Sequence, residues 1–370
     1  MIRNVPFFNY PSVYSAYRQE FIAALDNVGT RGAFILQKDL VEFEQALASY
    51  TGAKYAIGVA NATDALEMGF VAGGLQPGAE VIISSHTMMA TASAVHVAGG
   101  VPVPVEVGSD RCIDLESIEA AITPRTRAIC PTQLNGRTCD MDRLTKIAQA
   151  HHLDIYEDSA QALGSKFNGR SAGTFGKTGC LSFYPAKVLG CFGDGGAVLT
   201  NDDEIYRKIL LLRDHGRNAE GEVEFWARNS RLDNLQAAFL NLQFKDYPKV
   251  VTRRRVIAAL YQQRLGDCSR IQLPPHPDSN PKHFDIYQNY EIEADKRDEL
   301  RVFLKEQGVG TLIQWGGRPV HQFSKLGFTQ CLPKTDNFFK RCIMLPLNMS
   351  MTDDDLHYVC DRVLDFYRTR

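Results

Sequence analysis

The sequence contains no long apolar run and no excess of charge of one sign. None of its apolar stretches is long enough to cross a bilayer, and the first residues lack the apolar segment of a signal peptide. We therefore expect a cytoplasmic protein that does not bind membranes. The 41 Lys and Arg residues nearly balance the 43 Asp and Glu residues, and the net charge of −2 gives no general attraction to nucleic acid.

Patterns typical of disulfides and metal sites are also missing. The nine cysteines are odd in number and form no CxxC pair, and the nine histidines show no HExxH spacing. A disulfide framework or a structural zinc site is therefore not expected. We predict reduced thiols, several of them in the core, and no metal site.

The length and the apolar pattern are typical of a globular α/β protein. The 370 residues allow roughly two domains of about 150 residues each. In the first half, short apolar segments alternate with segments of helical spacing, which predicts a mostly parallel sheet with helices on both faces. We place a boundary near residue 245, between a large domain (1–245) and a smaller C-terminal domain (246–370). The expected strands are Lys54–Ala60, Glu80–Ile83, Val101–Val105, Arg127–Cys130, Asp154–Tyr156, Cys180–Tyr184, Ala197–Thr200 and Tyr287–Ile292.

Helical spacing marks the segments between and after these strands. Thr63 is predicted to cap the helix after the first strand. Arg253–Arg255 is predicted to lie on the solvated face of a long helix. The other expected helices begin near Gln37 or span 87–97, 115–122, 142–151, 204–213, 232–242, 298–307 and 353–367.

Two polar residues directly follow predicted strands, where ligands of open α/β sheets bind. Asp158, in EDSAQALG, either caps a helix or faces a cationic ring nitrogen. Lys187, in SFYPAK, is either a solvated surface charge or a nucleophile whose pKa is lowered by desolvation.

A third position is suited to phosphate. Ala62 and Thr63 open a helix after a strand, so backbone N–H groups and the Thr63 hydroxyl form a possible phosphate cradle. The Ser182 hydroxyl is a further donor. Each has an ordinary alternative, an N-cap or a small core residue. The nearby GDGG run (193–196) is neither a Walker motif nor a dinucleotide fingerprint.

Pyridoxal 5′-phosphate (PLP) would use all of these residues at once. Its phosphate would lie on residues 62–63 and Ser182, its ring nitrogen would face Asp158, and its aldehyde carbon would be held by Lys187 as a Schiff base. A carboxylate beside the ring nitrogen keeps that nitrogen protonated, so that the ring accepts electrons.

The motifs resemble those of the DegT/DnrJ/StrS group of PLP-dependent sugar aminotransferases over nearly the full chain. The matching segments occur in the family's order: GVANATDALEMG, EDSAQALGS, SFYPAKVLGCFGDGG, LRDHGR and RNSRLDNLQAA. The resemblance implies the fold of aspartate aminotransferase, the type I PLP fold, with a large mostly parallel sheet domain and a smaller C-terminal α+β domain.

The resemblance also implies roles for individual residues. Lys187 would hold the cofactor and carry the proton, Asp158 would pair with the ring nitrogen, and Gln161 would lie beside the ring. Ala62, Thr63 and Ser182 would bind the phosphate. Asn229 would reach the phosphate of the neighbouring subunit's cofactor, so the active unit would be a homodimer.

The implied reaction is transamination of a nucleotide-linked keto sugar, with pyridoxamine phosphate as the carrier and an amino acid, by family habit L-glutamate, as the donor. The product would be an amino sugar for glycan or polysaccharide biosynthesis. SFYPAKVLGCFGDGG resembles members acting on 3-keto-6-deoxyhexoses more than those acting at C4, which stay the alternative. A dehydratase with the same cofactor would carry His in place of Lys187. A non-catalytic PLP-fold regulator is a further alternative, opposed by the intact Lys187, Asp158 and Gln161.

Some positions depart from the family pattern. Met88 stands where an aromatic residue usually stacks on the cofactor ring, and either its polarizable side chain or His86 would cover the ring instead. Trp315 and Arg318 are unusual in the IQWGGRPVHQF segment, whereas His321 matches the family's histidine near the substrate. An aromatic plane and a guanidinium suit a nucleobase and a diphosphate, although a packed Trp and a surface Arg are equally ordinary.

Overall fold

The computed structural model describes residues 2–368 and has the predicted α/β fold, built on a large sheet. The order of the seven strands is β1-β9-β8-β5-β4-β2-β3, and only β9 runs against its neighbours. Every strand expected in this region is present. The strands are β1 (Tyr55–Val59), β2 (Glu80–Ser84), β3 (Val101–Val105), β4 (Thr126–Cys130), β5 (Asp154–Asp158), β8 (Thr178–Ser182) and β9 (Gly196–Thr200).

Helices cover both faces of this sheet. Alternate residues of a strand point to opposite faces, and apolar residues lie on both faces here. In β2, Val81 and Ile83 pack with α4 (Ala62–Ala72), α5 (Met89–Val97) and α8 (Asp203–Arg213). Ile82 packs on the other face with α6 (Leu115–Ala121) and α7 (Met141–Ala150). On that face α3 (Lys38–Thr51) and α9 (Asn234–Phe244) cover β1, β8 and β9. The expected helices of this region are therefore confirmed, with ends shifted by a few residues.

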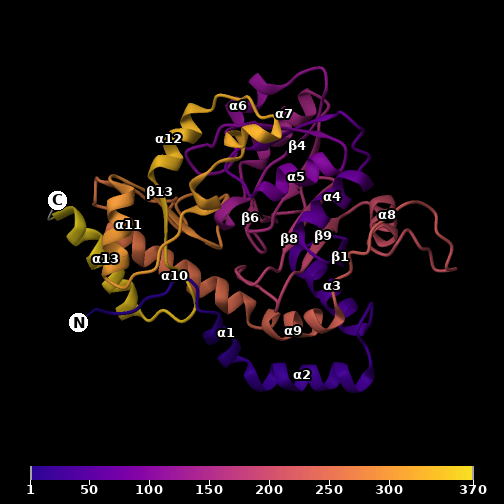
Figure 1. Cartoon of the computed structure of the whole chain (residues 1–370), viewed down its shortest axis with the longest axis horizontal. Helices are drawn as coiled ribbons and strands as arrows, with labels where there is room; N and C mark the ends of the chain where they lie inside the picture. The colour runs from indigo at the N-terminus through magenta and orange to yellow at the C-terminus, as the bar shows by residue number, and fades with distance from the viewer. Residues whose placement is uncertain (1, 369–370) are drawn as a thin grey trace.

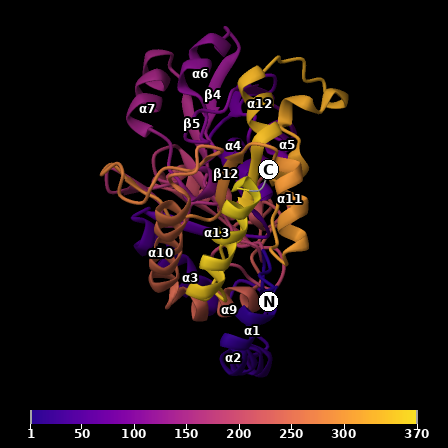
Figure 2. The same cartoon turned by 90° about the vertical axis from the view of Figure 1, so that its left-hand side faces the viewer.

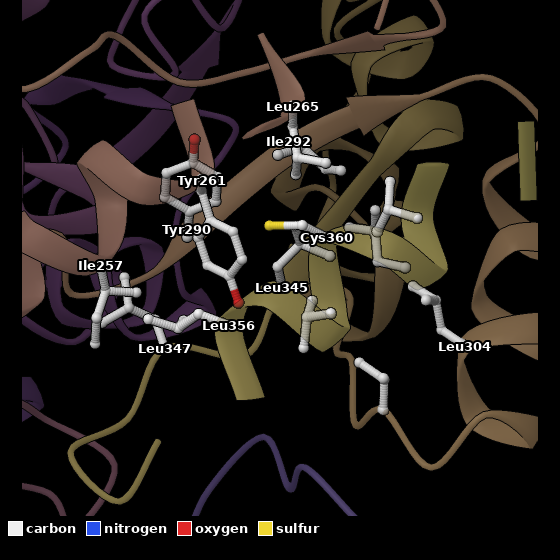
Figure 3. Close-up of a cluster of buried hydrophobic side chains, with 14 of the residues drawn as sticks. Ile257, Tyr261, Leu265, Tyr290, Ile292, Leu304, Leu345, Leu347, Leu356 and Cys360 are labelled. Carbon is white, nitrogen blue, oxygen red and sulfur yellow. The ribbon is translucent and has the colours of Figure 1, made fainter. Parts of the chain in front are cut away.

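The C-terminal part forms a second hydrophobic core around a small sheet of order β10-β12-β13. Figure 2 shows α10, α13 and α11 side by side over it. Tyr261 and Tyr290 pack at the centre of this core with their ring centroids 4.8 Å apart, and Cys360 lies beside them (Figure 3). The elements are α10 (Tyr247–Leu265), β10 (Ile271–Gln272), β12 (Tyr290–Ala294), α11 (Arg297–Glu306), α12 (Pro333–Arg341), β13 (Cys342–Leu345) and α13 (Asp353–Arg368).

The N-terminal segment connects the two cores. Helices α1 (Tyr10–Ala16) and α2 (Arg18–Arg31), which the sequence pattern did not indicate, follow it, and α2 lies beneath α9 in Figure 1. Val5 pairs with Val309 and is buried in the C-terminal core. The division at residue 245 falls between α9 and α10 and stays a proposal, since the first residues pack with the C-terminal part.

Three local expectations were wrong. Asn61, not Thr63, caps α4, and its Oδ1 accepts the Asp64 N–H at 2.8 Å. Arg254 is buried rather than solvated, because its guanidinium donates to the carbonyl oxygens of Tyr287 and Gln288 at 2.8 and 2.7 Å. The strand expected from Tyr287 begins only at Tyr290, since Tyr287 has a positive φ of 52°.

Short elements complete the fold. A small sheet of order β11-β6-β7 combines β6 (Lys166–Phe167), β7 (Arg170–Ser171) and β11 (His283–Phe284). Seven of the nine cysteines are buried, and all nine are free thiols, as predicted. Among residues 2–368, no helix is long and apolar enough to cross a membrane.

Candidate active site

A cavity of about 490 Å³ lies at the carboxyl ends of the large sheet's strands, where ligands were expected. It brings together residues that lie more than two hundred positions apart in the chain. Of the predicted site residues, the cavity is lined by Ala62, Thr63, Met88, Asp158, Gln161, Ser182, Lys187 and Trp315.

The start of α4 forms one end of the cavity. The first N–H groups of a helix have no partner within it. Asn61 takes the N–H of Asp64, which leaves those of Ala62 and Thr63 available to a ligand at the positive end of the helix dipole. Ser182, at the end of β8, lines the same cavity. The set suits a phosphate group.

Gly196 explains why the GDGG run lies here. A Cβ atom at this position would lie 2.5 Å from the Asn61 carbonyl carbon and 2.7 Å from the Ala62 nitrogen. Only glycine therefore lets the start of β9 contact the start of α4. The run shapes the backbone of the phosphate end and does not itself resemble a nucleotide-binding loop.

Asp158 is a buried carboxylate on the cavity wall. Its Oδ2 accepts the Thr91 hydroxyl at 2.6 Å, and its Oδ1 accepts the Ala160 N–H at 3.2 Å. Within residues 2–368 no cationic side chain forms an ion pair with Asp158, and the Lys187 ammonium interacts with it only at longer range. A buried carboxylate is costly without a compensating cation, so a ligand carrying a protonated ring nitrogen fits this wall.

Lys187 follows β8 on a short loop, and its backbone N–H donates to Tyr184 O at 2.8 Å. Burial lowers the pKa of its ammonium group, and the nearby Asp158 and Cys180 act in the opposite direction. Desolvation therefore favours the neutral amine, which is the form that attacks an aldehyde.

Gln161 and Met88 also line the cavity. The Gln161 Oε1 accepts the Asn135 N–H at 2.8 Å, so its Nε2 group is the part left to donate toward a ligand. Met88 is 51% exposed and lines the cavity, whereas His86 is fully buried and does not line it. Of the two residues considered for covering the ring, only Met88 is therefore in reach.

The C-terminal part supplies the opposite wall. Trp315 lines the cavity together with Gln314, Gln288 and Asn289, which sequence reasoning missed. These amides lie in short segments without a recognisable motif, so no sequence signal identified them.

Three predicted residues do not line the cavity. His321 is buried, with Nδ1 2.7 Å from Ser85 Oγ and Nε2 3.1 Å from Asp336 Oδ1. Arg318 is exposed and donates to Gln322 O at 2.6 Å. Asn229 is exposed in the segment after α8, which extends to the right in Figure 1.

The comparison with known proteins identifies the family. Residues 15–364 match the DegT/DnrJ/EryC1/StrS aminotransferase family. The chain belongs to this family. The resemblance stated from the motifs is thereby confirmed, and with it PLP as the cofactor, for which the phosphate end, Asp158 and Lys187 are chemically suited.

Relatives in this family match the chain over almost its full length. A "pleiotropic regulatory protein" of Geobacillus stearothermophilus is 36% identical and covers 99% of both chains. A dTDP-3-amino-3,4,6-trideoxy-alpha-D-glucose transaminase of Streptomyces venezuelae is also 36% identical, covering 98% of this chain and 96% of the relative. The crystal structure of DesV from S. venezuelae, in complex with a ketimine intermediate, matches with a TM-score of 0.94 at 36% identity over 98% of each chain. The type I PLP fold is therefore also confirmed.

Proposed function

We propose that this protein transfers an amino group from an amino acid to a nucleotide-linked 3-keto sugar and so makes an amino sugar for glycan or polysaccharide biosynthesis. The observation that carries the proposal is the single cavity lined by Lys187, Asp158 and the start of α4. The 3-amino sugar in the name of the S. venezuelae relative supports C3 as the aminated carbon. The 4-keto sugar stays the alternative.

Each residue of the cavity then has a defined task. The start of α4 and Ser182 would bind the phosphate of PLP, and Asp158 would keep the ring nitrogen protonated. When bound, PLP supplies an electron sink for the carbon that carries the amino group. Lys187 Nζ would take a proton from that carbon and deliver it to the aldehyde-derived carbon of the cofactor, which requires the neutral amine that burial favours.

The substrate is proposed to lie between the cofactor and the C-terminal wall. Trp315 would contact the sugar or the nucleobase, and Arg318, three residues further on and exposed, would reach the diphosphate. His321 is held by Ser85 and Asp336, so we assign it to shaping this segment near the substrate.

A homodimer with shared sites is proposed from the segment after α8. Trp226 is fully exposed there, and Val223 is 65% exposed, although large apolar side chains of this kind are usually covered. Asn229 lies in the same segment and would complete the partner's phosphate site. Sedimentation velocity tests the dimer, and a cytoplasmic location stays a prediction from the sequence.

The proposal is tested by visible absorbance of the purified protein after PLP is added and excess cofactor removed. A band from lysine-bound cofactor that bleaches on addition of L-glutamate alone supports the cofactor, Lys187 and the donor together. Amino-sugar nucleotides of the 3-amino and 4-amino series then test the acceptor in the reverse direction. A protein that retains PLP but reacts with no amino acid or amino sugar would instead be a regulator, as the name of the Geobacillus relative suggests for that protein.

A further inference from the structure

A buried chain of hydrogen bonds lies behind the C-terminal wall of the cavity. The Trp315 indole Nε1–H donates to His86 Nδ1 at 3.1 Å, and the His86 Nε2 lies 3.0 Å from Glu291 Oε2. His86 follows β2 in the large domain, whereas Glu291 is in β12 and Trp315 follows α11. The chain therefore crosses between the two parts of the molecule.

The chemistry of the donors fixes the direction of this chain. An indole N–H only donates, so His86 Nδ1 is the acceptor. The His86 proton is consequently on Nε2 and is donated to the Glu291 carboxylate. Glu291 thus selects the tautomer of His86 that is able to hold the Trp315 ring.

Glu291 also connects to the cofactor side of the cavity through Asn135. The Asn135 Nδ2 donates to Glu291 Oε2 at 2.9 Å, and its backbone N–H donates to Gln161 Oε1. Asn135 Oδ1 accepts Gln314 Nε2 at 2.7 Å. Glu291 Oε1 has no partner within residues 2–368, so the carboxylate depends on the two donors to Oε2.

The indole does not hold its position by local preference. Trp315 has a φ of 55°, a left-handed conformation that is unfavourable for a bulky side chain, and Gly316 and Gly317 beside it also have positive φ. His86 in turn is fixed between Phe338 and Phe339, with ring centres 4.9 Å away in each case. Tertiary contacts therefore determine where the indole lies: the hydrogen bond to His86 and packing against the cluster that contains Phe338 and Phe339.

We propose that His86 and Glu291 are positioning residues that hold the Trp315 indole against the cavity and so set the fit of the sugar nucleotide. This inference rests on the proposed function, in which Trp315 contacts the substrate. The two residues do not line the cavity and act only through Trp315 and Asn135.

The experiment uses the PLP-loaded protein and the reverse half-reaction with dTDP- and UDP-linked 3-amino and 4-amino hexoses. Kinetics are measured with whichever of these the wild type converts fastest. W315F removes the indole N–H but keeps a ring, and H86F removes both nitrogens but keeps the packing against Phe338 and Phe339. Each is expected to lower kcat/KM about tenfold, mainly through KM, because each removes the one hydrogen bond between His86 and Trp315. PLP affinity and the lysine-bound absorbance band should be unchanged.

The double variant separates positioning from general damage. If His86 acts through Trp315, the kcat/KM of H86F/W315F should fall about tenfold. Independent effects of the two substitutions would multiply and lower it roughly a hundredfold. E106Q is the matched control, because Glu106 is also buried and joins the two parts through the Thr335 N–H at 2.7 Å without lining the cavity. Its effect should multiply with that of W315F.

Fluorescence of the cofactor-free protein gives a readout that does not depend on turnover. The chain has two tryptophans, so the wild-type spectrum minus that of W315F reports Trp315. The H86F spectrum minus that of H86F/W315F reports Trp315 without its His86 partner, and this difference spectrum should be shifted from the wild-type one. The fluorescence spectrum of E291Q, which keeps an acceptor for His86, should lie closer to that of the wild type than the spectrum of E291L does.

The outcomes distinguish the two claims. If the wild type converts none of the amino sugars, the proposed function fails and this inference with it. If it does convert one, multiplicative losses in H86F/W315F or an unchanged Trp315 spectrum in H86F would overturn the positioning role alone.

Discussion

The two walls of the cavity are built in different ways. On the large-domain side, the polar groups come from strand ends and a helix start: Asp158 ends β5, Ser182 ends β8, and Ala62 begins α4. On the C-terminal side, Trp315 and Gln314 lie in a short 3₁₀ segment, held by hydrogen bonds to His86 and Asn135 that span 229 and 179 positions. The first wall follows from local sequence patterns, and the second exists only once the chain has folded.

This difference suggests a division of labour. Chemistry common to a family needs groups at fixed positions around one cofactor, which regular secondary structure provides. Discrimination between sugars needs a surface that varies without disturbing that chemistry, and loops serve this purpose. Three predictions test the comparison, beginning with the largest effect.

Replacement of Lys187 by Ala should abolish the function of the large-domain wall without unfolding the protein. We expect turnover to fall by at least about 10³-fold, because the proton-carrying group is lost, while the thermal midpoint changes little. Rates of amino-sugar formation and the far-UV circular dichroism of the same sample measure the two effects.

K177A is the matched control for this substitution. Lys177 lies just before the other end of β8 and pairs with Asp154 at 2.8 Å, far from the reacting group along the strand. It should keep wild-type turnover. Normal turnover in K187A would defeat the proposed mechanism.

The residues of the large-domain wall could be located in one cavity from the sequence because their signals are local. A buried strand followed by Asp158 or Lys187 already indicates the edge of the sheet at which the side chain lies. The cap of α4 was assigned to Thr63 instead of Asn61, so the predicted helix began too late in the chain. Ala62 and Thr63 nevertheless line the cavity, as predicted.

The C-terminal wall could be predicted only in part. Trp315 was singled out because it is unusual in its segment, but Gln314, Asn289 and the pairing of His86 with Glu291 were not. Nothing in the spacing of these residues indicates a contact, since each depends on how the two cores meet. The buried Arg254 was misjudged for the same reason, because its partners are carbonyl oxygens far along the chain.

Substitution of Gly196 by Ala tests a backbone contact of the large-domain wall rather than a functional side chain. The added Cβ would meet backbone atoms of Asn61 and Ala62, which cannot move without shifting the start of α4. We expect a loss of about 1–3 kcal/mol in the free energy of unfolding and a roughly tenfold weaker PLP affinity. Denaturant unfolding of the cofactor-free protein and a PLP titration measure these.

G29A provides the control, because no atom lies within 4 Å of a Cβ at Gly29, which is exposed in α2. It should be neutral or slightly stabilising, since Ala favours helix by up to about 1 kcal/mol over Gly. Equal effects of G196A and G29A would show that the close contact at the phosphate end is unimportant.

The smallest effect concerns the charge behind the C-terminal wall. Burial raises the pKa of Glu291, but the His86 ring and the Asn135 amide lower it more, so the net pKa lies below the ordinary 4.5. The unfolded chain therefore takes up this proton at a higher pH than the folded chain does. Ionised Glu291 thus contributes stability that is fully present above about pH 4.5 and is lost as the pH falls through the folded pKa.

E291Q removes this titration while keeping an acceptor for His86. The free energy of unfolding of the wild type minus that of E291Q should therefore decline as the pH is lowered from 6 to below 4.5, by an amount on the order of 1 kcal/mol. Urea unfolding at several pH values measures it, and using the difference cancels the titration of the remaining carboxylates. A constant difference would mean that folding leaves the pKa of Glu291 unshifted, and a difference that grows toward low pH would mean that Glu291 is protonated in the folded protein. Its proton would then compete with the His86 Nε2–H, and the tautomer that holds Trp315 would have to be set by Asn135 and the aromatic rings alone.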